Sequence, residues 1–196
     1  MKRSADVSRK TSETDVIISL EVDGSGESII GTSNGFLDHM LNLFAKHGQF
    51  NLNVKCLGDV EIDFHHSAED IGITLGMAFK KALGDKRGIN RYSHSYIPMD
   101  ETLIRVVLDI CGRTNLVYTE DLRDRKVNNF EVDLVYDFMK GFCDYAGVSM
   151  HIDILRARNS HHAIEAIFKG FGRALRTACE IDPRAADQIP STKGVI

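Results

Sequence analysis

Apolar residues recur along the first half of the chain with two different periods. Alternation of apolar and polar residues predicts a half-buried strand, whereas apolar residues three and four apart predict the buried face of a helix. The expected elements are, in chain order, a strand at 16–22, a helix at 37–44, strands at 52–56 and 60–64, and a helix at 71–84. The strand at 16–22 ends at Asp23-Gly24, which is typical of a turn.

The second half shows the same two periods in a similar order. The expected elements are a strand at 104–110, a helix at 134–142, a strand at 150–154 and a helix from about 160 to 179. The last helix carries its apolar residues on one side, and Pro183 follows it as a stop signal. The first half is thus expected to run strand, helix, two strands, helix, and the second half repeats this order with a single strand between its helices.

Self-similarity makes this repetition specific, because residues 44–66 align with residues 142–162 across a small gap. In both segments a helix leads to a strand, a turn and a His-His-x-x-Glu motif that opens a second helix. Two repeats indicate a duplicated domain rather than a solenoid. We expect a single domain over 1–196, with pseudo-repeats of about 1–95 and 96–196. Its expected fold is α+β, an internally duplicated α/β sandwich similar to a ribosomal-protein domain, with helices covering one face of each half's sheet.

Composition places the chain among ordinary globular proteins. Of its 196 residues, 43% are hydrophobic and 27% charged, which excludes a disordered or low-complexity chain. The net charge of -4 without a basic block argues against a nucleic-acid partner. No apolar run reaches the roughly 18 residues of a membrane span, so we expect a cytoplasmic protein. The four cysteines form no C-x-x-C pair and fit reduced packing residues.

Four of the eight histidines stand in two His-His pairs, each opening a His-His-x-x-Glu motif. The motifs are His65-His66-Ser67-Ala68-Glu69 and His161-His162-Ala163-Ile164-Glu165. On a helix the first His and the Glu share one face, while the adjacent His points about 100° away, so a pair can serve two different ions. Imidazole and carboxylate ligands suit manganese, zinc or iron, and the lack of nearby cysteine argues against a closed structural zinc site. We favour a catalytic site that leaves positions open for substrate.

A plainer interpretation is that paired histidines at a strand-to-helix junction only satisfy helix-end groups, but duplication of the motif argues against it. Ser67 with Asp70 resembles a capping box, which would start the first helix two residues later than its counterpart. The repeat alignment instead favours equivalent starts. The same alignment pairs His39 with Asp137, and a carboxylate can replace an imidazole as a metal ligand.

At these motifs the chain resembles the imidazoleglycerol-phosphate dehydratase family of histidine biosynthesis, over essentially its whole length. The resemblance is carried by FLDHML at 36–41, HHSAEDIG at 65–72, NSHHAIEA at 159–166 and PSTKG at 190–194, with weaker support at 88–92 and 109–113. The family implies a metal-dependent hydro-lyase that converts D-erythro-imidazole glycerol phosphate to imidazole acetol phosphate and water. It also implies active sites with two Mn²⁺ ions each, built where the subunits of a 24-subunit homo-oligomer meet.

The resemblance assigns a role to each matching residue. The implied metal ligands are His39, His65, His66, Glu69, His161, His162 and Glu165, with Asp137 where the family usually has another histidine. This departure leaves open whether Asp137 or a water completes the ligand set. A second departure is Leu43, where many members carry a glutamine at the substrate.

Further residues are assigned to substrate and catalysis. The implied phosphate-binding residues are Arg91, Arg113, Ser191 and Lys193, whose donors suit a phosphate ester. Glu13 would move the proton as general acid/base, and His47 would contact the substrate. The complete implied substrate-binding set is Glu13, His39, His47, His65, His66, Glu69, Arg91, Arg113, His161, Ser191 and Lys193, and the catalytic set is Glu13, His66, Glu69, His162 and Glu165.

Three other functions stay open from the residues themselves. A two-metal hydrolase of a small phosphorylated substrate would also use clustered histidines and carboxylates, but it would release phosphate. A nucleic-acid-binding module on the same fold would need basic, aromatic surface strands, whereas this chain is acidic and has no tryptophan. A metal-storage or structural oligomer would leave Arg91, Arg113 and Lys193 unexplained.

Overall fold

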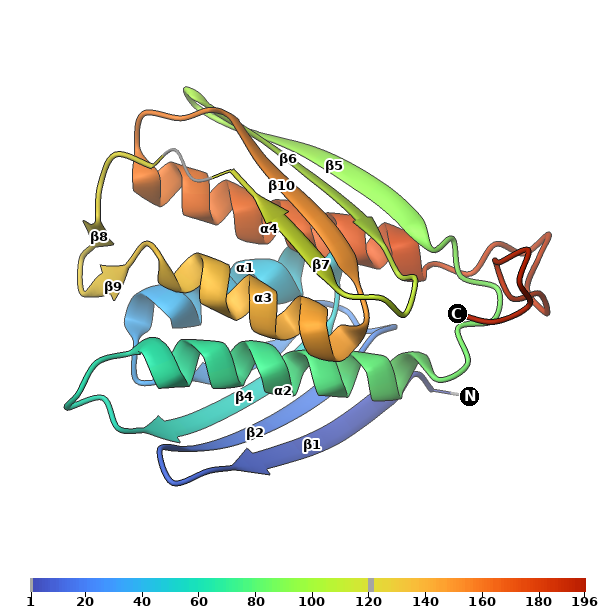
Figure 1. The fold of residues 1–196 in the computed structure, drawn as a ribbon, viewed down its shortest axis with the longest axis horizontal. Coiled ribbons are helices and arrows are strands. Elements are labelled where there is room, and N and C mark those ends of the chain that lie inside the picture. The colour runs from blue at the N-terminus through green and yellow to red at the C-terminus, as the bar shows by residue number, and fades with distance from the viewer. Residues whose placement is uncertain (1, 120–121) are drawn as a thin grey trace.

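The computed structural model describes residues 2–119 and 122–196 and arranges them in four layers (Figure 1). Two four-stranded sheets form the outer layers, and two pairs of helices lie between them. The elements are β1 (Ser4–Lys10), β2 (Thr14–Glu21), β3 (Ser28–Gly31), α1 (Gly35–Gly48), β4 (Asn51–Gly58), α2 (His65–Leu83), β5 (Tyr92–Met99), β6 (Thr102–Asp109), β7 (Asn115–Tyr118), β8 (Lys126–Val127), β9 (Phe130–Glu131), α3 (Leu134–Ala146), β10 (Ser149–Arg156) and α4 (Ser160–Cys179).

The two sheets have the same topology. Their strand orders are β1-β2-β4-β3 and β5-β6-β10-β7, and in each sheet the first three strands are antiparallel while the last pair is parallel. The register of the strands also matches. In the first sheet Ile18 pairs with Val54, and in the second sheet the equivalent residues Val106 and Ile152 pair with each other. The predicted duplicated α+β sandwich is confirmed as a fold class.

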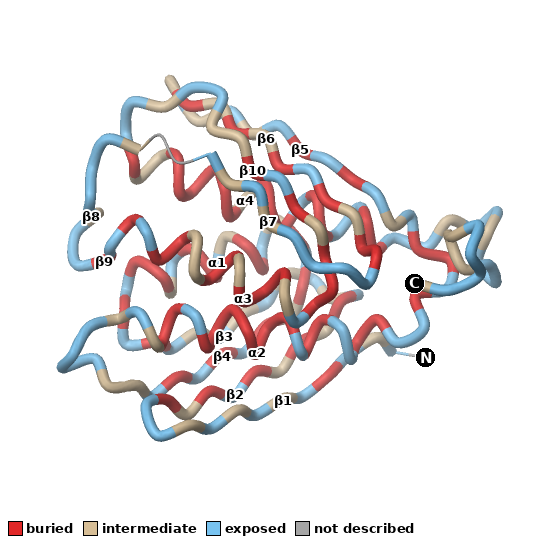
Figure 2. Tube along the Cα trace, viewed as in Figure 1, coloured by how far each residue is buried: buried red, intermediate tan, exposed pale blue. Residues whose placement is uncertain are grey.

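Helices from different halves pack against each other in the interior. α1 lies against α4 and α2 lies against α3, so the middle layers join the halves, and buried residues line both (Figure 2). Several glycines allow this close approach, two of them at equivalent positions of the repeat. A Cβ added at Gly76 would lie 2.6 Å from the carbonyl oxygen of Phe142, and one at Gly172 would lie 2.5 Å from that of Phe44. Real Cβ atoms do not come this close, so both positions require glycine or a shift of the helices.

Strand prediction was less accurate than helix prediction. The strand expected at 60–64 is wrong, because this segment is a turn in which Val60 and Ile62 are exposed. The strands β1, β3, β5 and β7 were not predicted. β3 and β7 are short edge strands without a fully buried face, and the inward positions of β5 include the polar residues Ser93 and Ser95. Neither arrangement gives an apolar alternation.

The two histidine pairs lie in the first turns of their helices. α2 begins at His65, so the start suggested by a capping box at Ser67 is wrong; the Asp63 carboxylate instead accepts from the His65 N–H at 2.8 Å. α4 begins at Ser160, where the Asn159 side chain accepts from the His161 N–H at 2.9 Å. Both helices begin at the end of the molecule where the β1–β2 and β5–β6 hairpins turn (Figure 1).

Two further features of the structure concern membrane-spanning helices and the cysteines. Within residues 2–119 and 122–196, no helix is both long and apolar enough to cross a membrane. All four cysteines are free and buried, as expected for packing residues, and burial raises the pKa of the Cys143 thiol to about 12.

Candidate functional site

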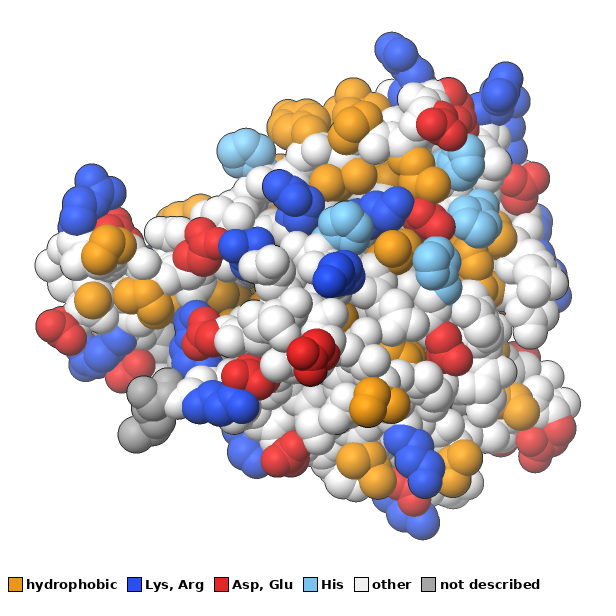
Figure 3. Space-filling view, turned by 180° about the vertical axis from the view of Figure 1, so that it is seen from behind, with side chains coloured by type: hydrophobic (Ala, Val, Ile, Leu, Met, Phe, Trp, Pro, Cys, Tyr) orange, Lys and Arg blue, Asp and Glu red, His pale blue; other side chains and the backbone are white. Residues whose placement is uncertain are grey.

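One cluster of ligand-type side chains forms where α1 meets the start of α4. The Glu165 Oε1 atom lies 2.7 Å from His39 Nε2 and 3.2 Å from His161 Nε2. Glu165 is buried, whereas the two histidine side chains are about half exposed, so the cluster opens toward solvent. We call His39, His161 and Glu165 the α4 cluster. In the view from behind, some histidine side chains lie close together toward the right of the surface, and others lie apart from them (Figure 3).

The carboxyl group of Glu165 is held in its ionised form. Burial by itself would raise its pKa, but hydrogen bonds from Lys169, His39 and His161 outweigh burial and lower the pKa to about 2. The Lys169 Nζ donates to Glu165 Oε2 at 2.7 Å, one helical turn further along α4. The Glu165 carboxylate is therefore ionised at neutral pH, and it lies with the two imidazoles so that the ligand-type atoms are all within 4.8 Å of one another.

The second cluster is less compact. Asp137 on α3 reaches His65 at the start of α2, with Oδ2 3.4 Å from His65 Nδ1. Glu69 lies one turn after His65 and is exposed. We call His65, Glu69 and Asp137 the α2 cluster. His39 and Asp137 thus occupy matching places, as the repeat alignment indicates, and each belongs to a cluster whose other residues come from the opposite half of the chain.

Both clusters have the chemistry that a divalent ion requires. In the α4 cluster two imidazoles and a carboxylate converge on a volume small enough for one ion, and in the α2 cluster an imidazole and two carboxylates lie around one helix start. Neither contains a thiol, which disfavours a closed tetrahedral zinc centre. The donor sets therefore fit the metal that the resemblance implies, with positions left for additional ligands.

The second histidine of each pair is directed away from its cluster. His66 Nδ1 lies 3.0 Å from Asp59 Oδ2, and His162 Nδ1 lies 3.1 Å from Glu101 Oε2. The contact with Asp59 raises the pKa of His66, and the contact with His162 lowers the pKa of Glu101 to about 2. The predicted ligands His66 and His162 therefore do not join the α4 and α2 clusters. His162 instead groups with Asp100 and Glu101, whose ligand-type atoms also lie within 4.8 Å of one another.

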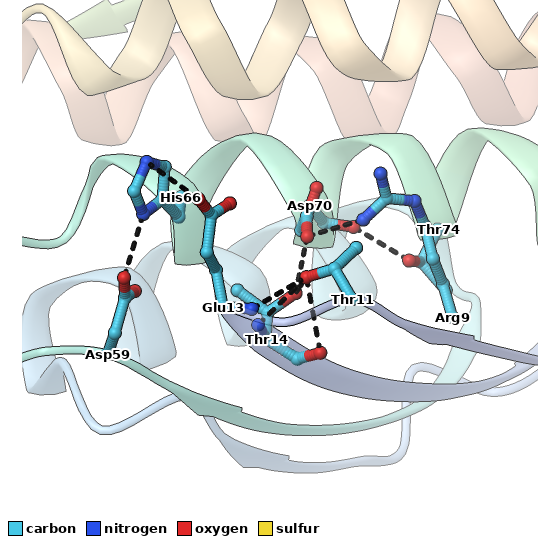
Figure 4. Close-up of polar contacts among 8 residues, drawn as sticks. All are labelled: Arg9, Thr11, Glu13, Thr14, Asp59, His66, Asp70 and Thr74. Carbon is cyan, nitrogen blue, oxygen red and sulfur yellow. Dashed lines mark hydrogen bonds and ion pairs between the residues drawn. The ribbon is translucent and has the colours of Figure 1, made fainter.

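Glu13 is placed beside His66 by the β1–β2 hairpin (Figure 4). Its Oε1 atom is 3.9 Å from His66 Nε2, which is too long for a hydrogen bond. The Thr11 hydroxyl accepts from the Glu13 N–H at 3.1 Å, and Thr14 donates its hydroxyl to the buried Asp70 of α2. The hairpin is thus tied to the helix that carries His66.

The predicted phosphate-binding residues lie at the other end of the molecule. The Arg91 N–H donates to the carbonyl of Ala178, near the end of α4. Ala178 is 17 positions after His161, so the rise of a helix puts the two about 25 Å apart. The Arg91 guanidinium pairs with Asp109 at 2.7 Å and donates to the carbonyl of Pro190 at 2.8 Å.

The other phosphate-binding candidates lie near Arg91. Ser191 follows Pro190 directly and Lys193 lies two residues further on, and the Lys193 N–H donates to the Ser191 hydroxyl at 3.2 Å. Arg113 is exposed and follows Gly112, where an added Cβ would lie 3.1 Å from the backbone of Ile196. The four candidates are therefore grouped at the chain's C-terminal tail, but they are far from both clusters in the same chain.

His47 is also separated from the clusters. It lies near the end of α1, eight positions after His39, which corresponds to about 12 Å along the helix. It lines a small hollow with Arg173, Arg176 and Thr177. Desolvation and the charges of Lys169 and Arg173 lower the pKa of His47, so it is neutral at neutral pH.

Sequence reasoning missed several polar residues of this end of the molecule, among them Asp100, which groups with Glu101 and His162. Lys169 could have been found from its spacing of four from Glu165 on a helix. Glu101 precedes β6 as Glu13 precedes β2, so the repeat offered a signal. Asp59 follows the end of β4 in a turn, and no pattern in the sequence singles it out.

Comparison with known proteins gives a consistent result. Residues 32–175 match the family model of imidazoleglycerol-phosphate dehydratase. Over its full length the chain is 54% identical to the full-length imidazoleglycerol-phosphate dehydratase of Ralstonia pickettii, and it is 52% identical to that of Methylobacillus flagellatus over 98% of this chain and 97% of the relative.

Solved structures agree in fold as well as in sequence. The imidazoleglycerol-phosphate dehydratase of Staphylococcus aureus superposes with a TM-score of 0.83 at 41% identity, covering 91% of this chain and 99% of that chain. The enzyme of Pyrococcus furiosus gives 0.84 at 34% identity, with 97% and 100% covered. The chain therefore belongs to the imidazoleglycerol-phosphate dehydratase family, whose members are hydro-lyases of histidine biosynthesis.

Proposed function

We propose that this chain converts D-erythro-imidazole glycerol phosphate to imidazole acetol phosphate and water, using two Mn²⁺ ions per active site. The observation that carries the proposal is the α4 cluster, in which His39, His161 and the ionised Glu165 converge. The α2 cluster supplies a second, related donor set on a matching helix start. Two donor sets suit a substrate whose ring has two nitrogens, because each nitrogen can face its own ion.

Different residues of the chain would carry out different parts of the reaction. Bound Mn²⁺ would act as a Lewis acid toward the imidazole ring and make loss of a ring proton easier. Glu13 is exposed and held beside His66 by the β1–β2 hairpin, which suits a carboxylate that must reach a substrate C–H and then release the proton. Arg91, Arg113, Ser191 and Lys193 would bind the phosphate through charge-assisted hydrogen bonds.

These residues can meet one substrate only if different copies of the chain contribute them. About 25 Å separates His161 from the arginine end of α4, whereas a three-carbon chain links the phosphate to the imidazole ring. We therefore propose that sites form between subunits of a homo-oligomer, with the 24-subunit shell that family resemblance implies. Exposed apolar side chains on the outer faces of both sheets support such contacts: Ile17, Ile29, Leu57, Tyr96, Val107 and Val117. The proposed location is the cytoplasm.

The test is an assay of anaerobically purified protein with imidazole glycerol phosphate. The metal is first removed with a chelator, and Mn²⁺ is then added back while ketone formation and inorganic phosphate are both followed. We expect ketone only in the presence of Mn²⁺ and no release of phosphate. Phosphate release without ketone would instead identify a two-metal hydrolase, and no metal-dependent product would refute the proposed function.

A further inference from the structure

We propose that Asp59 and Glu101 are positioning residues, which hold His66 and His162 so that each presents its Nε2 atom to a metal ion. Placing one carboxylate behind each of these histidines also leaves Glu13, the repeat counterpart of Glu101, free for proton transfer. The inference rests on the proposed function, because it concerns how the same site is held ready for its metal.

In the second half the positioning carboxylate is fixed at both oxygens. Glu101 Oε2 lies 3.1 Å from His162 Nδ1, and Oε1 accepts from the Asn159 N–H at 3.0 Å. Asn159 is the residue before α4 and caps that helix with its side chain. Glu101 therefore joins the β5–β6 turn to the helix start and to the imidazole at once, which limits rotation of the ring.

In the first half the carboxylate comes from a different segment (Figure 4). Asp59 Oδ2 lies 3.0 Å from His66 Nδ1, and the Asp59 side chain is only 15% exposed. Its backbone is fixed on both sides, because the Asp59 N–H donates to the Glu13 carbonyl at 3.1 Å and its carbonyl accepts from the Ile62 N–H at 2.9 Å. The turn after β4 thus supplies a rigid acceptor for His66.

A carboxylate at Nδ1 decides which ring nitrogen can bind a metal. An ionised carboxylate only accepts, so Nδ1 must carry the proton, and the neutral ring then has its lone pair on Nε2. Such partners are the usual means by which proteins orient imidazole ligands and raise their basicity. At His66 the Glu13 carboxylate lies 3.9 Å from Nε2 and makes no hydrogen bond with it, so the lone pair stays available to a metal ion.

The repeat explains why two different segments do this work. Glu13 and Glu101 each stand one residue before an equivalent strand, β2 or β6, and the next residues, Thr14 and Thr102, are both buried. After the equivalent strands β4 and β10, however, the chain has Asp59 in one half and Ala157 in the other. In the first half Asp59 contacts the imidazole, so Glu13 is free for proton transfer. In the second half Ala157 offers no carboxylate, and Glu101 contacts the imidazole instead.

The experiment measures Mn²⁺ affinity directly, by equilibrium dialysis with elemental analysis, in the full chain and in Asp59→Asn, Glu101→Gln and Glu13→Gln. Loss of a metal-orienting partner commonly weakens metal binding by about 10- to 100-fold. We expect a loss of this size in Asp59→Asn and in Glu101→Gln, and wild-type affinity in Glu13→Gln. The conservative variants Asp59→Glu and Glu101→Asp keep a carboxylate and should recover part of the affinity.

Glu61→Gln is the matched control, since it makes the same acid-to-amide change on an exposed residue of the same turn as Asp59. The melting temperature of each metal-free variant separates positioning from folding. Unchanged Mn²⁺ affinity in Asp59→Asn and Glu101→Gln would overturn the inference, as would equal losses in Glu13→Gln. A loss of affinity matched by a lower melting temperature, and not recovered by the conservative variants, would also overturn it. Failure of the proposed function would appear separately, as the absence of ketone from the wild-type protein with Mn²⁺.

Discussion

The two halves of the molecule use the same backbone plan but differ in the side chains that surround equivalent helix starts. At α4 the carboxylate Glu165 is buried and bonded to Lys169, whereas at α2 the matching Glu69 is exposed and Ile73 stands in the place of the lysine. The core positions have kept their chemistry, as the paired contacts of Gly76 with Phe142 and Gly172 with Phe44 show. The copies therefore differ at the proposed ligand site, while this pair of helix contacts is kept in both halves.

The largest effect that can test this comparison is the loss of one cluster at a time. His161→Ala removes an imidazole from the α4 cluster, and His65→Ala removes one from the α2 cluster. We expect each variant to lose about half of its bound manganese and essentially all turnover, because in the proposed site each cluster holds its own ion. Elemental analysis of the purified protein measures this, and loss of all metal in either variant would show that the clusters are not independent.

A smaller effect is expected at Glu13, the glutamate of the β1–β2 hairpin, whose loss should change turnover but not metal binding. In Glu13→Gln we expect kcat to fall by about 10²- to 10⁴-fold, because the amide cannot take up the substrate proton. Bound manganese and KM should stay near wild-type values, since Glu13 is 3.9 Å from the nearest imidazole nitrogen of His66 and makes no hydrogen bond with it. Steady-state kinetics with metal analysis checks both expectations, and near-normal kcat would remove Glu13 from the catalytic set.

Substitutions at the two equivalent helix contacts between the halves should destabilise the protein equally. Gly76→Ala and Gly172→Ala each introduce a Cβ within 2.6 Å of a backbone oxygen on the facing helix. We expect each to lower the free energy of unfolding by about 1–3 kcal/mol, the usual cost of overpacking. Gly35→Ala is the control, because nothing lies within 4 Å of an added Cβ there. Chemical denaturation measures all three, and a large inequality between the first two would show that the two helix contacts are not equivalent.

The smallest expected effect is a pH dependence that only the first half carries, through His47. Its pKa in the folded protein is lowered from the ordinary 6.5 by desolvation and by Lys169 and Arg173. The folded state binds this proton less well than the unfolded state, so stability is complete above pH 6.5 and decreases as the pH falls through the lowered pKa. The melting temperature of metal-free wild type should fall relative to that of His47→Gln in this acidic range, and parallel curves would exclude His47 as the cause.

How far the sequence predicted the fold depended on burial. The helix expected from about 160 to 179 matches α4, because its buried stripe includes Ile164, Ile167 and Phe171. β5 was missed because its inward positions include the polar residues Ser93 and Ser95, so the strand has no alternation of apolar and polar residues. The segment at 60–64 was wrongly predicted as a strand because its alternating Val60 and Ile62 are exposed in a turn.

For the candidate site, the sequence identified the residue types and the structure identified their partners. The two His-His-x-x-Glu motifs and the equivalence of His39 with Asp137 were all visible in the repeat. The sequence did not show that α1 packs on α4 and α3 on α2, so that each cluster joins both halves. His39 and Glu165, which are 126 positions apart in the chain, meet only for this reason.

The amino-acid sequence by itself determined the duplication, the buried helices and the family, because periodicity, spacing and residue type are local properties of the chain. The tertiary structure decided which carboxylate faces which imidazole, placing Asp59 behind His66 and Glu101 behind His162. It also decided that Arg91 lies at the far end of α4 from His161. Such arrangements depend on how helices and turns pack across the core, and packing is set by the shapes of distant residues rather than by any local pattern.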